Sequence, residues 1–217
     1  MVAEKNTVVH VPLLVGMTGG LGSGKSSVCG MLAGMGCAVF EADKIARDLQ
    51  VEDPEVVTGI KRIFGNDVYS RDEKGRLWLD RLRIAQKVFR DAGALKELNE
   101  LIHPKVFRAF HEAVDSARAK GARILVKEAA ILLEAGGDKG LDLIVVVVSD
   151  LEKRIARAMR KGMGSREEIM RRIDAQWPQE KLVERADFII ENNGTIEELE
   201  QSVHELYHKI IGMAGAC

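Results

Sequence analysis

Residues 19–26 read Gly-Gly-Leu-Gly-Ser-Gly-Lys-Ser and match the pattern G-x-x-x-x-G-K-[ST], whose residue types suit the binding of phosphate groups. The glycines let the backbone turn tightly enough for its N–H groups to point at phosphate oxygens. Lys25 adds a positive charge for the β- and γ-phosphates, and the hydroxyl of Ser26 can ligate Mg²⁺. The octapeptide therefore predicts a site for a nucleoside triphosphate with Mg²⁺.

The residues on either side of this loop predict the elements that position it. An apolar run over residues 12–17 predicts the preceding strand, and residues 26–35 predict the following helix. The N-terminus of a helix offers unpaired N–H donors and a partial positive charge to a bound phosphate. We therefore expect the nucleotide to be bound by Gly19, Gly20, Leu21, Gly22, Ser23, Gly24, Lys25, Ser26 and Ser27.

Composition narrows the class of protein. A chain of 217 residues with 46% hydrophobic and 30% charged residues can bury a large core, as one domain or as a core with insertions. The net charge of −1 and the lack of a long basic block argue against a nucleic-acid partner. The longest apolar run, residues 143–148, is too short to cross a membrane. The three cysteines form no C-x-x-C pair, which argues against disulfides and zinc and favours the cytoplasm.

Apolar segments alternate with helical patterns along much of the chain. This alternation predicts an α/β fold with a five-stranded, mostly parallel sheet and helices on both faces. The expected strands are residues 13–17, 38–40, 123–127, 143–148 and 188–190. Capping boxes, Ser165 with Glu168 and Thr195 with Glu198, predict the starts of two of the later helices.

The segment from residue 50 to about 118 interrupts the alternation and predicts a helical insertion. Asp53-Pro54 begins a helix that we expect to close at Gly65, and residues 69–75 read as a polar loop. Three further helices are expected at residues 80–89, 91–101 and 104–119.

Polar residues follow each expected strand, at the edge of a parallel sheet where ligands bind. They are Asp43, Glu128, Ser149, Asp150, Asn192 and Asn193. Asp43 is a candidate to accept a proton from an attacking hydroxyl, or to hold Mg²⁺ through water. Its alternative roles are a solvated carboxylate or the cap of the next helix. For Glu128, a role near Mg²⁺ and a role as a capped strand end stay equally open.

Arginines gather on the helix expected after the fourth strand, at positions 154, 157 and 160. On a solvated helix such residues often serve only as surface. Gly162 and Gly164, however, flank Met163 and predict a hinge, and phosphoryl-transfer enzymes commonly close a cationic lid over ATP. An arginine at the transferred phosphoryl group can raise the rate about 10³- to 10⁵-fold.

Taken in order, these motifs resemble the dephospho-CoA kinase family from about Leu14 to Gly194. The shared set comprises residues 18–26, 42–47, 88–89, 98–104 and 132–134, Arg157 with Arg160, Gln176, and residues 186–194. The resemblance implies ATP-dependent phosphorylation of the ribose 3′-hydroxyl of dephospho-CoA. It also implies a P-loop NTPase core (residues 8–49, 120–153 and 186–217), a helical CoA-binding insertion (50–119) and a small helical lid (154–185).

The resemblance also implies roles for single residues. Asp43 would be the base that takes the hydroxyl proton, Lys25 and Arg160 would stabilise charge on the migrating phosphoryl group, and Ser26 would hold Mg²⁺. Arg157 and Arg160 would bind the nucleotide, with Asn192 near its adenine. Substrate contacts would come from Asp43, His103 and Glu134, although a histidine before a proline is often structural. The expected partner is dephospho-CoA, bound by a monomer or a small homo-oligomer.

Four positions depart from the usual family pattern: Glu41, Ser27, Ala130 and Lys161. Glu41 and Ser27 keep the chemistry of the usual aspartate and threonine. Ala130 replaces a frequent proline, and Lys161 replaces a common aspartate after the lid arginine. None of the four removes a group that phosphoryl transfer needs.

Two rival functions stay open on the sequence alone. A kinase of similar build could act on another small acceptor, such as a nucleoside monophosphate, although an insertion of nearly 70 residues suits a long pantetheine arm. A regulatory GTPase would need guanine-reading motifs. Residues 72–75 do fit D-x-x-G, but they lie in an expected polar loop and no N-K-x-D follows.

Overall fold

The computed structural model describes residues 11–214, without the side chains at 89, 90 and 92. The chain divides into two compact units, Met1–Glu41 with Ala113–Cys217 and Ala42–Glu112. Residues 8–10 and 215–217, which the predicted nucleotide-binding core includes, lie outside the described residues.

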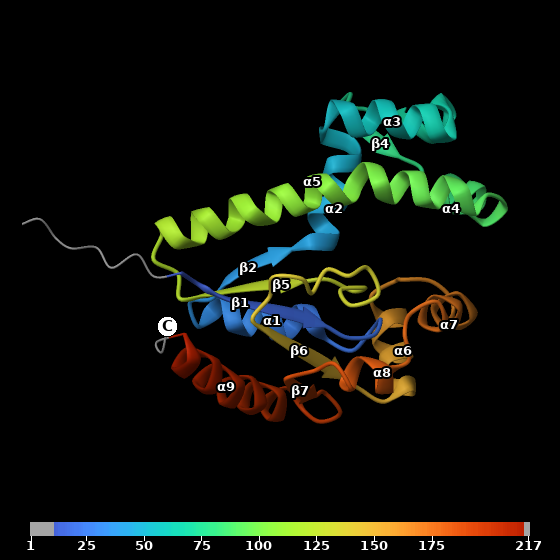
Figure 1. Ribbon diagram of the computed structural model, residues 1–217. Helices are drawn as coiled ribbons and strands as arrows, with labels where there is room; N and C mark the ends of the chain where they lie inside the picture. Colours follow the sequence, from blue (N-terminus) through green and yellow to red (C-terminus); the bar gives the residue numbers. More distant parts are fainter. Residues whose placement is uncertain (1–10, 215–217) are drawn as a thin grey trace, which may run out of the picture. The chain divides into compact units, whose positions relative to one another are not determined.

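The first unit is built on a five-stranded sheet (Figure 1). All of its pairings are parallel, so the predicted α/β fold is confirmed. β1 lies at the centre between β5 and β6, with Val15 opposite Val126 on one side and Leu143 on the other. The strand order is β2 (Ala38–Glu41), β5 (Ile124–Glu128), β1 (Leu13–Thr18), β6 (Leu143–Val148) and β7 (Phe188–Glu191).

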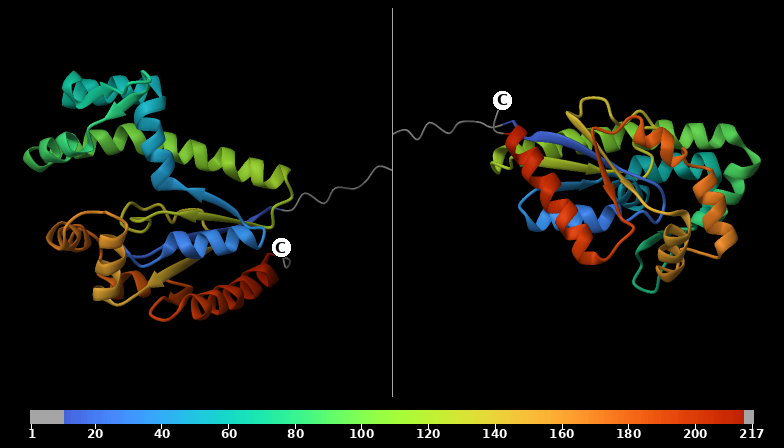
Figure 2. Two further views of the ribbon diagram at one scale, coloured as in Figure 1. Left: turned by 180° about the vertical axis from the view of Figure 1, so that it is seen from behind. Right: turned by 90° about the horizontal axis from the view of Figure 1, so that it is seen from below.

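Both faces of this sheet are covered, which explains the unbroken apolar run of β6. On one face, α1 (Lys25–Gly34) and α9 (Ile196–Met213) lie side by side (Figures 1 and 2) and pack on Val145 and Val147. On the other face, Val146 and Val148 contact a cluster that includes a residue of α8 (Gln179–Val183). Burial on both faces requires apolar residues at consecutive positions rather than at alternate ones.

Two more helices follow β6 and form an apolar cluster of their own. α6 (Leu151–Arg160) and α7 (Arg166–Asp174) pack through Ile155, Ala158 and Ile169. The predicted capping boxes begin α7 at Ser165 and α9 at Thr195. In each box the side-chain oxygen accepts from a backbone N–H of the first turn, which satisfies a donor that the helix leaves unpaired.

The second unit is helical, with one small β-hairpin. Its own core gathers Val56, Ile60, Phe64, Val68 and Ile102. The elements are α2 (Ala42–Glu52), α3 (Pro54–Phe64), a 3₁₀ turn (Asn66–Val68), β3 (Tyr69–Arg71), β4 (Leu77–Leu79), α4 (Arg81–Arg90) and α5 (Ala92–Ala119), whose last turns belong to the first unit.

The structure corrects two expectations in this unit. The predicted break between residues 101 and 104 is wrong, because α5 runs continuously through Pro104. A proline costs a helix one hydrogen bond, but Ile102 before it and Val106 after it both pack on the same core. The predicted loop at residues 69–75 is also wrong in part. β3 occupies its first half and pairs with β4, and such short strands give almost no periodic signal.

One helix of this unit was not predicted at all. α2 begins directly after β2, at Ala42, where we expected only the end of a strand. Its residues Ala46 and Leu49 pack against the unit's core. Asp43 therefore lies in the first turn of a helix, two residues beyond the end of β2.

Candidate active site

The phosphate-binding motif forms a loop between β1 and α1. Three of its glycines cannot be replaced by larger residues, because of their backbone angles and the close approach of neighbouring atoms. Gly19, Gly22 and Gly24 have φ angles of 147°, 77° and 103°, which side chains of L-residues disfavour. A Cβ atom on Gly19 would lie 2.3 Å from the carbonyl oxygen of Val147. On Gly22 it would lie 2.2 Å from the carbonyl oxygen of Arg154. The loop thus packs directly on the backbone of its neighbours.

Asn192, just after β7, ties this loop to the sheet. Its Nδ2 donates to the carbonyl oxygen of Ser23 at 2.7 Å, and its Oδ1 accepts from Arg157 at 3.0 Å. A Cβ atom on Gly24 would approach Nδ2 to 2.1 Å. The side chain is buried and its amide serves the loop and α6. We had expected it near the adenine, and this expectation stays a prediction.

Lys25 holds its ammonium group against the loop itself. Its Nζ donates to the carbonyl oxygens of Gly19 at 2.7 Å and Gly20 at 3.4 Å, and the residue is only 9% exposed. The positive charge is therefore held among the backbone groups of the phosphate loop.

Ser26 and Glu128 form an oxygen-rich pair beside the loop. The Ser26 hydroxyl donates to Oε1 of Glu128 at 3.1 Å. Hydroxyl and carboxylate oxygens are ligands that suit Mg²⁺, so the pair fits this ion. Within residues 11–214, no cluster of three or more His, Cys, Asp or Glu side chains could hold a metal by itself.

Cys29 lies one turn further along α1, and its chemistry does not compete with this pair. Burial raises the pKa of its thiol far above the usual range, and the nearby charge of Glu128 raises it further. The group therefore stays a neutral thiol at physiological pH. A neutral thiol is a poor metal ligand, which leaves the oxygen donors to define the site.

Two of the three arginines of α6 support the loop and the strand ends. Arg154 is buried, and its Nε donates to the carbonyl oxygen of Leu21 at 2.9 Å. Arg157 donates to Oγ of Ser149 and to the carbonyl oxygen of Asn192, each at 2.9 Å. Arg160, in the last turn of the helix, is exposed. Of the three arginines, Arg160 thus presents its side chain to solvent.

The polar residues after β6 and β7 come together as the strand order implies. Oδ1 of Asn193 accepts from the backbone N–H of Asp150 at 2.8 Å, and Oγ of Ser149 donates to the carbonyl oxygen of Asn192 at 2.8 Å. These bonds join the ends of two adjacent strands. The same residues therefore hold the edge of the sheet that carries the loop.

Sequence reasoning gave Gln176 no role at the site. Its Oε1 accepts from the backbone N–H of Leu21 at 2.7 Å, and its Nε2 donates to the carbonyl oxygen of Ala130 at 3.1 Å. Glu134, an expected substrate contact, accepts from the backbone N–H of Trp177 at 3.2 Å. The only signal for Gln176 in the sequence was the family resemblance.

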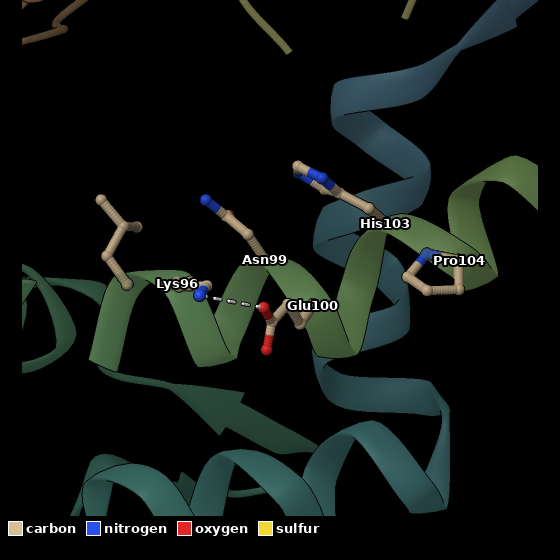
Figure 3. A pocket seen from close by; sticks show the side chains of 6 residues that line it. Lys96, Asn99, Glu100, His103 and Pro104 are labelled. Carbon is tan, nitrogen blue, oxygen red and sulfur yellow. Dashed lines mark ion pairs between the residues drawn. The ribbon is translucent and has the colours of Figure 1, made fainter. Parts of the chain in front are cut away.

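The remaining expected site residues belong to the second unit. Asp43 is exposed in the first turn of α2. His103 lines a pocket of about 500 Å³ on α5, together with Leu95, Lys96, Asn99, Glu100 and Pro104. Figure 3 shows Asn99 and His103 extending from the helix in the same direction, while Lys96 pairs with Glu100 at 3.8 Å.

The glycine-rich loop ends in Lys-Ser and joins β1, the central strand of a parallel sheet, to the helix α1. This arrangement defines a P-loop nucleotide-binding protein. The family model described as "Dephospho-CoA kinase" matches residues 13–198. This chain therefore belongs to the dephospho-CoA kinase family.

Individual relatives agree with this assignment. A dephospho-CoA kinase of Chlorobaculum tepidum is 56% identical over 93% of this chain and 97% of its own length. One of Chlorobium chlorochromatii is 53% identical over 94% and 96%. A crystal structure from Thermus thermophilus has a TM-score of 0.77 at 32% identity and covers 92% of this chain and 98% of that one. Among residues 11–214, no helix combines the length and apolarity that a membrane span needs.

Proposed function

We propose that this chain catalyses the ATP-dependent phosphorylation of dephospho-CoA at the ribose 3′-hydroxyl, giving coenzyme A and ADP. The observation that carries the proposal is the phosphate loop, intact at every fixed position of its motif, in a chain that matches the family model over residues 13–198. The loop binds the triphosphate, and the family match supplies the acceptor.

The chain's cations would act on the transferred phosphoryl group. Lys25, held against the loop by the carbonyl oxygens of Gly19 and Gly20, lies where β- and γ-phosphate oxygens bind in such loops. Arg160 is exposed at the end of α6 and can turn toward a bound nucleotide. Both charges would stabilise the negative charge that spreads over the phosphoryl oxygens during transfer.

Mg²⁺ would be held by Ser26 and Glu128, which lie 3.1 Å apart through their side-chain oxygens. When bound, this ion neutralises charge on the β- and γ-phosphate oxygens. With Glu128 already hydrogen-bonded to Ser26, the two oxygens are held in place before the ion arrives. This arrangement supports the choice of Ser26 as a metal ligand.

Asp43 would take the proton of the acceptor. In the step, the 3′-oxygen of the ribose forms a bond to the γ-phosphorus, and the bond from that phosphorus to the β,γ-bridging oxygen breaks. The hydroxyl proton moves to the carboxylate of Asp43, and ADP leaves. The position of Asp43, just beyond the end of a sheet strand, supports this role, because ligands bind at that edge of a parallel sheet.

The acceptor's pantetheine arm suits the pocket on α5. The pocket offers the apolar surface of Leu95 beside the amide of Asn99 and the imidazole of His103. An arm of methylene groups and amides can use both kinds of contact. Glu134, in the first unit, stays proposed as a substrate contact on the family match alone, since its Oε2 is buried in the structure.

We propose residues 50–119 as the acceptor domain and 154–185 as the lid, with movement confined to the middle of the lid. Arg154 and Leu182, near the two ends of the lid segment, are buried against the phosphate loop and the sheet. Gly162 and Gly164 have φ angles of 67° and 129°, as a turn between helices requires. The turn at residues 161–164, between α6 and α7, is therefore the part of the lid where a hinge would lie.

The structure gives the D-x-x-G match of the rival GTPase a different role. Oδ1 of Asp72 accepts from the backbone N–H groups of Lys74 and Arg76, each at 2.9 Å. These bonds shape the turn between β3 and β4. The other rival, a kinase for a nucleoside monophosphate, differs only in its acceptor and is tested by the experiment below.

The test measures ADP formation from ATP and Mg²⁺ with dephospho-CoA, AMP, shikimate or no acceptor. We expect turnover that depends on dephospho-CoA and falls about 10²- to 10⁴-fold in Asp43→Asn. Glu52→Gln, at the exposed end of the same helix, is the matched control and should keep full activity. Turnover with AMP instead, or only slow ATP hydrolysis, would overturn the acceptor assignment.

A further inference from the structure

Leu21, in the middle of the phosphate loop, is held on three sides by residues outside the loop. Its side chain packs against the apolar cluster of Ile155, Ala158 and Ile169 in α6 and α7. Its carbonyl oxygen accepts from Nε of Arg154 at 2.9 Å. Its backbone N–H donates to Oε1 of Gln176 at 2.7 Å. We name this set of contacts the Leu21 clasp.

Gln176 joins the clasp to a second loop. Its Nε2 donates to the carbonyl oxygen of Ala130, in the loop after β5, at 3.1 Å. The next residue, Trp177, donates its backbone N–H to Glu134 of that same loop at 3.2 Å. The junction between α7 and α8 is thus bonded both to the phosphate loop and to the loop that carries Glu134.

Trp177 fixes this junction on the core of the unit. Its ring packs against the cluster of Leu133, Val146, Val148 and Leu182, and Nζ of Lys181 lies 3.5 Å from the ring centroid. A displacement at Leu21 would therefore reach Gln176 through one short hydrogen bond and Trp177 through the next peptide. The bonding is continuous from the phosphate loop to the junction.

We propose that Gln176 is a positioning residue of the phosphate loop, and that the Leu21 clasp transmits nucleotide binding to the α7–α8 junction. The inference rests on the proposed binding of ATP and goes beyond it, because Gln176 touches the loop from outside. The side-chain amide of Gln176 accepts a hydrogen bond from the backbone N–H of Leu21 and donates one to the carbonyl oxygen of Ala130. A side chain without both functions would leave one of these groups unpaired.

The first experiment measures binding of the non-hydrolysable ATP analogue AMPPNP with Mg²⁺ by calorimetry, with Gln176→Met and Gln176→Asn beside the wild type. Methionine matches the length of glutamine without its hydrogen bonds, and asparagine keeps the amide but is too short to reach both partners. We expect the Kd to rise about five- to tenfold for Gln176→Met, which loses two hydrogen bonds, with a smaller rise for Gln176→Asn. Gln201→Met, on the exposed surface of α9, is the control and should bind as the wild type does.

The second readout separates positioning from a general loss of structure. In a Trp78→Phe background, Trp177 is the only tryptophan, so its fluorescence reports the junction. We expect AMPPNP with Mg²⁺ to change this fluorescence in the Trp78→Phe protein, and the change to be lost when Gln176→Met is added. In turnover, the KM for ATP should rise more than the KM for dephospho-CoA, because Gln176 bonds directly to the phosphate loop and is linked to Glu134 only through the next residue.

The outcomes distinguish the clasp from the proposed function. Wild-type affinity and an unchanged Trp177 response in both Gln176 variants would overturn the clasp alone. Equal rises in the KM values of both substrates would also overturn it, because they would indicate a general structural defect. Failure of the wild type to bind AMPPNP would overturn the proposed function together with the clasp.

Discussion

Gly24 illustrates how a single residue sets the shape of the phosphate loop. It combines a φ angle of 103° with the close approach of the Asn192 amide, so a methyl group there would be both strained and obstructed. We expect Gly24→Ala to weaken MgATP binding at least tenfold, because the loop must open to make room. Calorimetric titration with AMPPNP measures this effect.

Gly30 provides the matched control for this change. It is exposed in α1, and a Cβ atom there would meet nothing within 4 Å. Since alanine favours a helix over glycine by about 0.5–1 kcal/mol, Gly30→Ala should raise the melting temperature slightly and leave AMPPNP binding unchanged. Equal loss of binding in the two variants would contradict the steric account of the loop.

Two arginines of α6 should differ in what their substitution changes: stability for Arg157 and catalytic rate for Arg160. Arg157 makes hydrogen bonds to Ser149 and Asn192, so Arg157→Met should cost about 1–3 kcal/mol of unfolding free energy. Arg160 is exposed, and its proposed role is in the transition state. Arg160→Met should leave stability unchanged and lower kcat about 10³-fold.

Denaturant unfolding and steady-state kinetics on both arginine variants check this division of roles. The comparison is internal, since the two residues lie one turn apart on the same helix and undergo the same substitution. A stable Arg157→Met protein with lost kcat, beside an unstable Arg160→Met protein, would reverse the assignment.

At the scale of elements, Asp53 links the start of α3 to α5. Its Oδ1 accepts from the backbone N–H groups of Glu55 and Val56, and Lys105 of α5 donates to its Oδ2 at 2.8 Å. The hydrogen bond from Lys105, together with that from Val56, holds the pKa of Asp53 below its usual value near 3.8. The charged form is therefore favoured by folding.

This lowered pKa predicts a defined pH dependence. Because the folded pKa is below the unfolded one, the stabilisation by Asp53 is complete above about pH 4 and is lost as the pH falls through the folded value. Asp53→Asn keeps a good helix cap but removes the charge. We expect a lower melting temperature than wild type at pH 7, with the difference shrinking below pH 4.

Thermal unfolding of both proteins from pH 7 to pH 3 measures this dependence. Asp115→Asn, on an exposed part of α5, serves as the control for a simple change in net charge. A difference between wild type and Asp53→Asn that stays constant over this range would show that the ion pair with Lys105 contributes nothing.

For the whole molecule, the sequence predicted the sheet well and the insertion less well. The strands of the sheet are apolar runs bounded by turns, so the sequence shows where they begin and end. The unbroken apolar run at residues 143–148 also predicts that this strand is buried on both faces, as the structure shows. The hairpin of β3 and β4 has strands of three residues each, which are too short to show the alternation of apolar and polar residues that predicts a strand. The helix through Pro104 was missed because its packing on the core overrides the local signal of the proline.

The site shows the same limit in another form. Residues 19–26 could be predicted because all their chemistry lies within eight consecutive positions. The contact between Gln176 and Leu21 joins residues 155 positions apart, and no local pattern encodes it. The structural use of Arg154 and Arg157 was likewise hidden, because spacing on a helix does not tell whether a face is buried.

The most direct test of the whole account is to identify the product. The protein is incubated with ATP, Mg²⁺ and dephospho-CoA, and the product is examined by ³¹P NMR with proton correlation. We predict a new phosphate monoester coupled to the ribose H3′, formed in equal amount to ADP, and none with 3′-deoxy-dephospho-CoA as acceptor. A phosphate at any other position, or release of inorganic phosphate alone, would contradict the account.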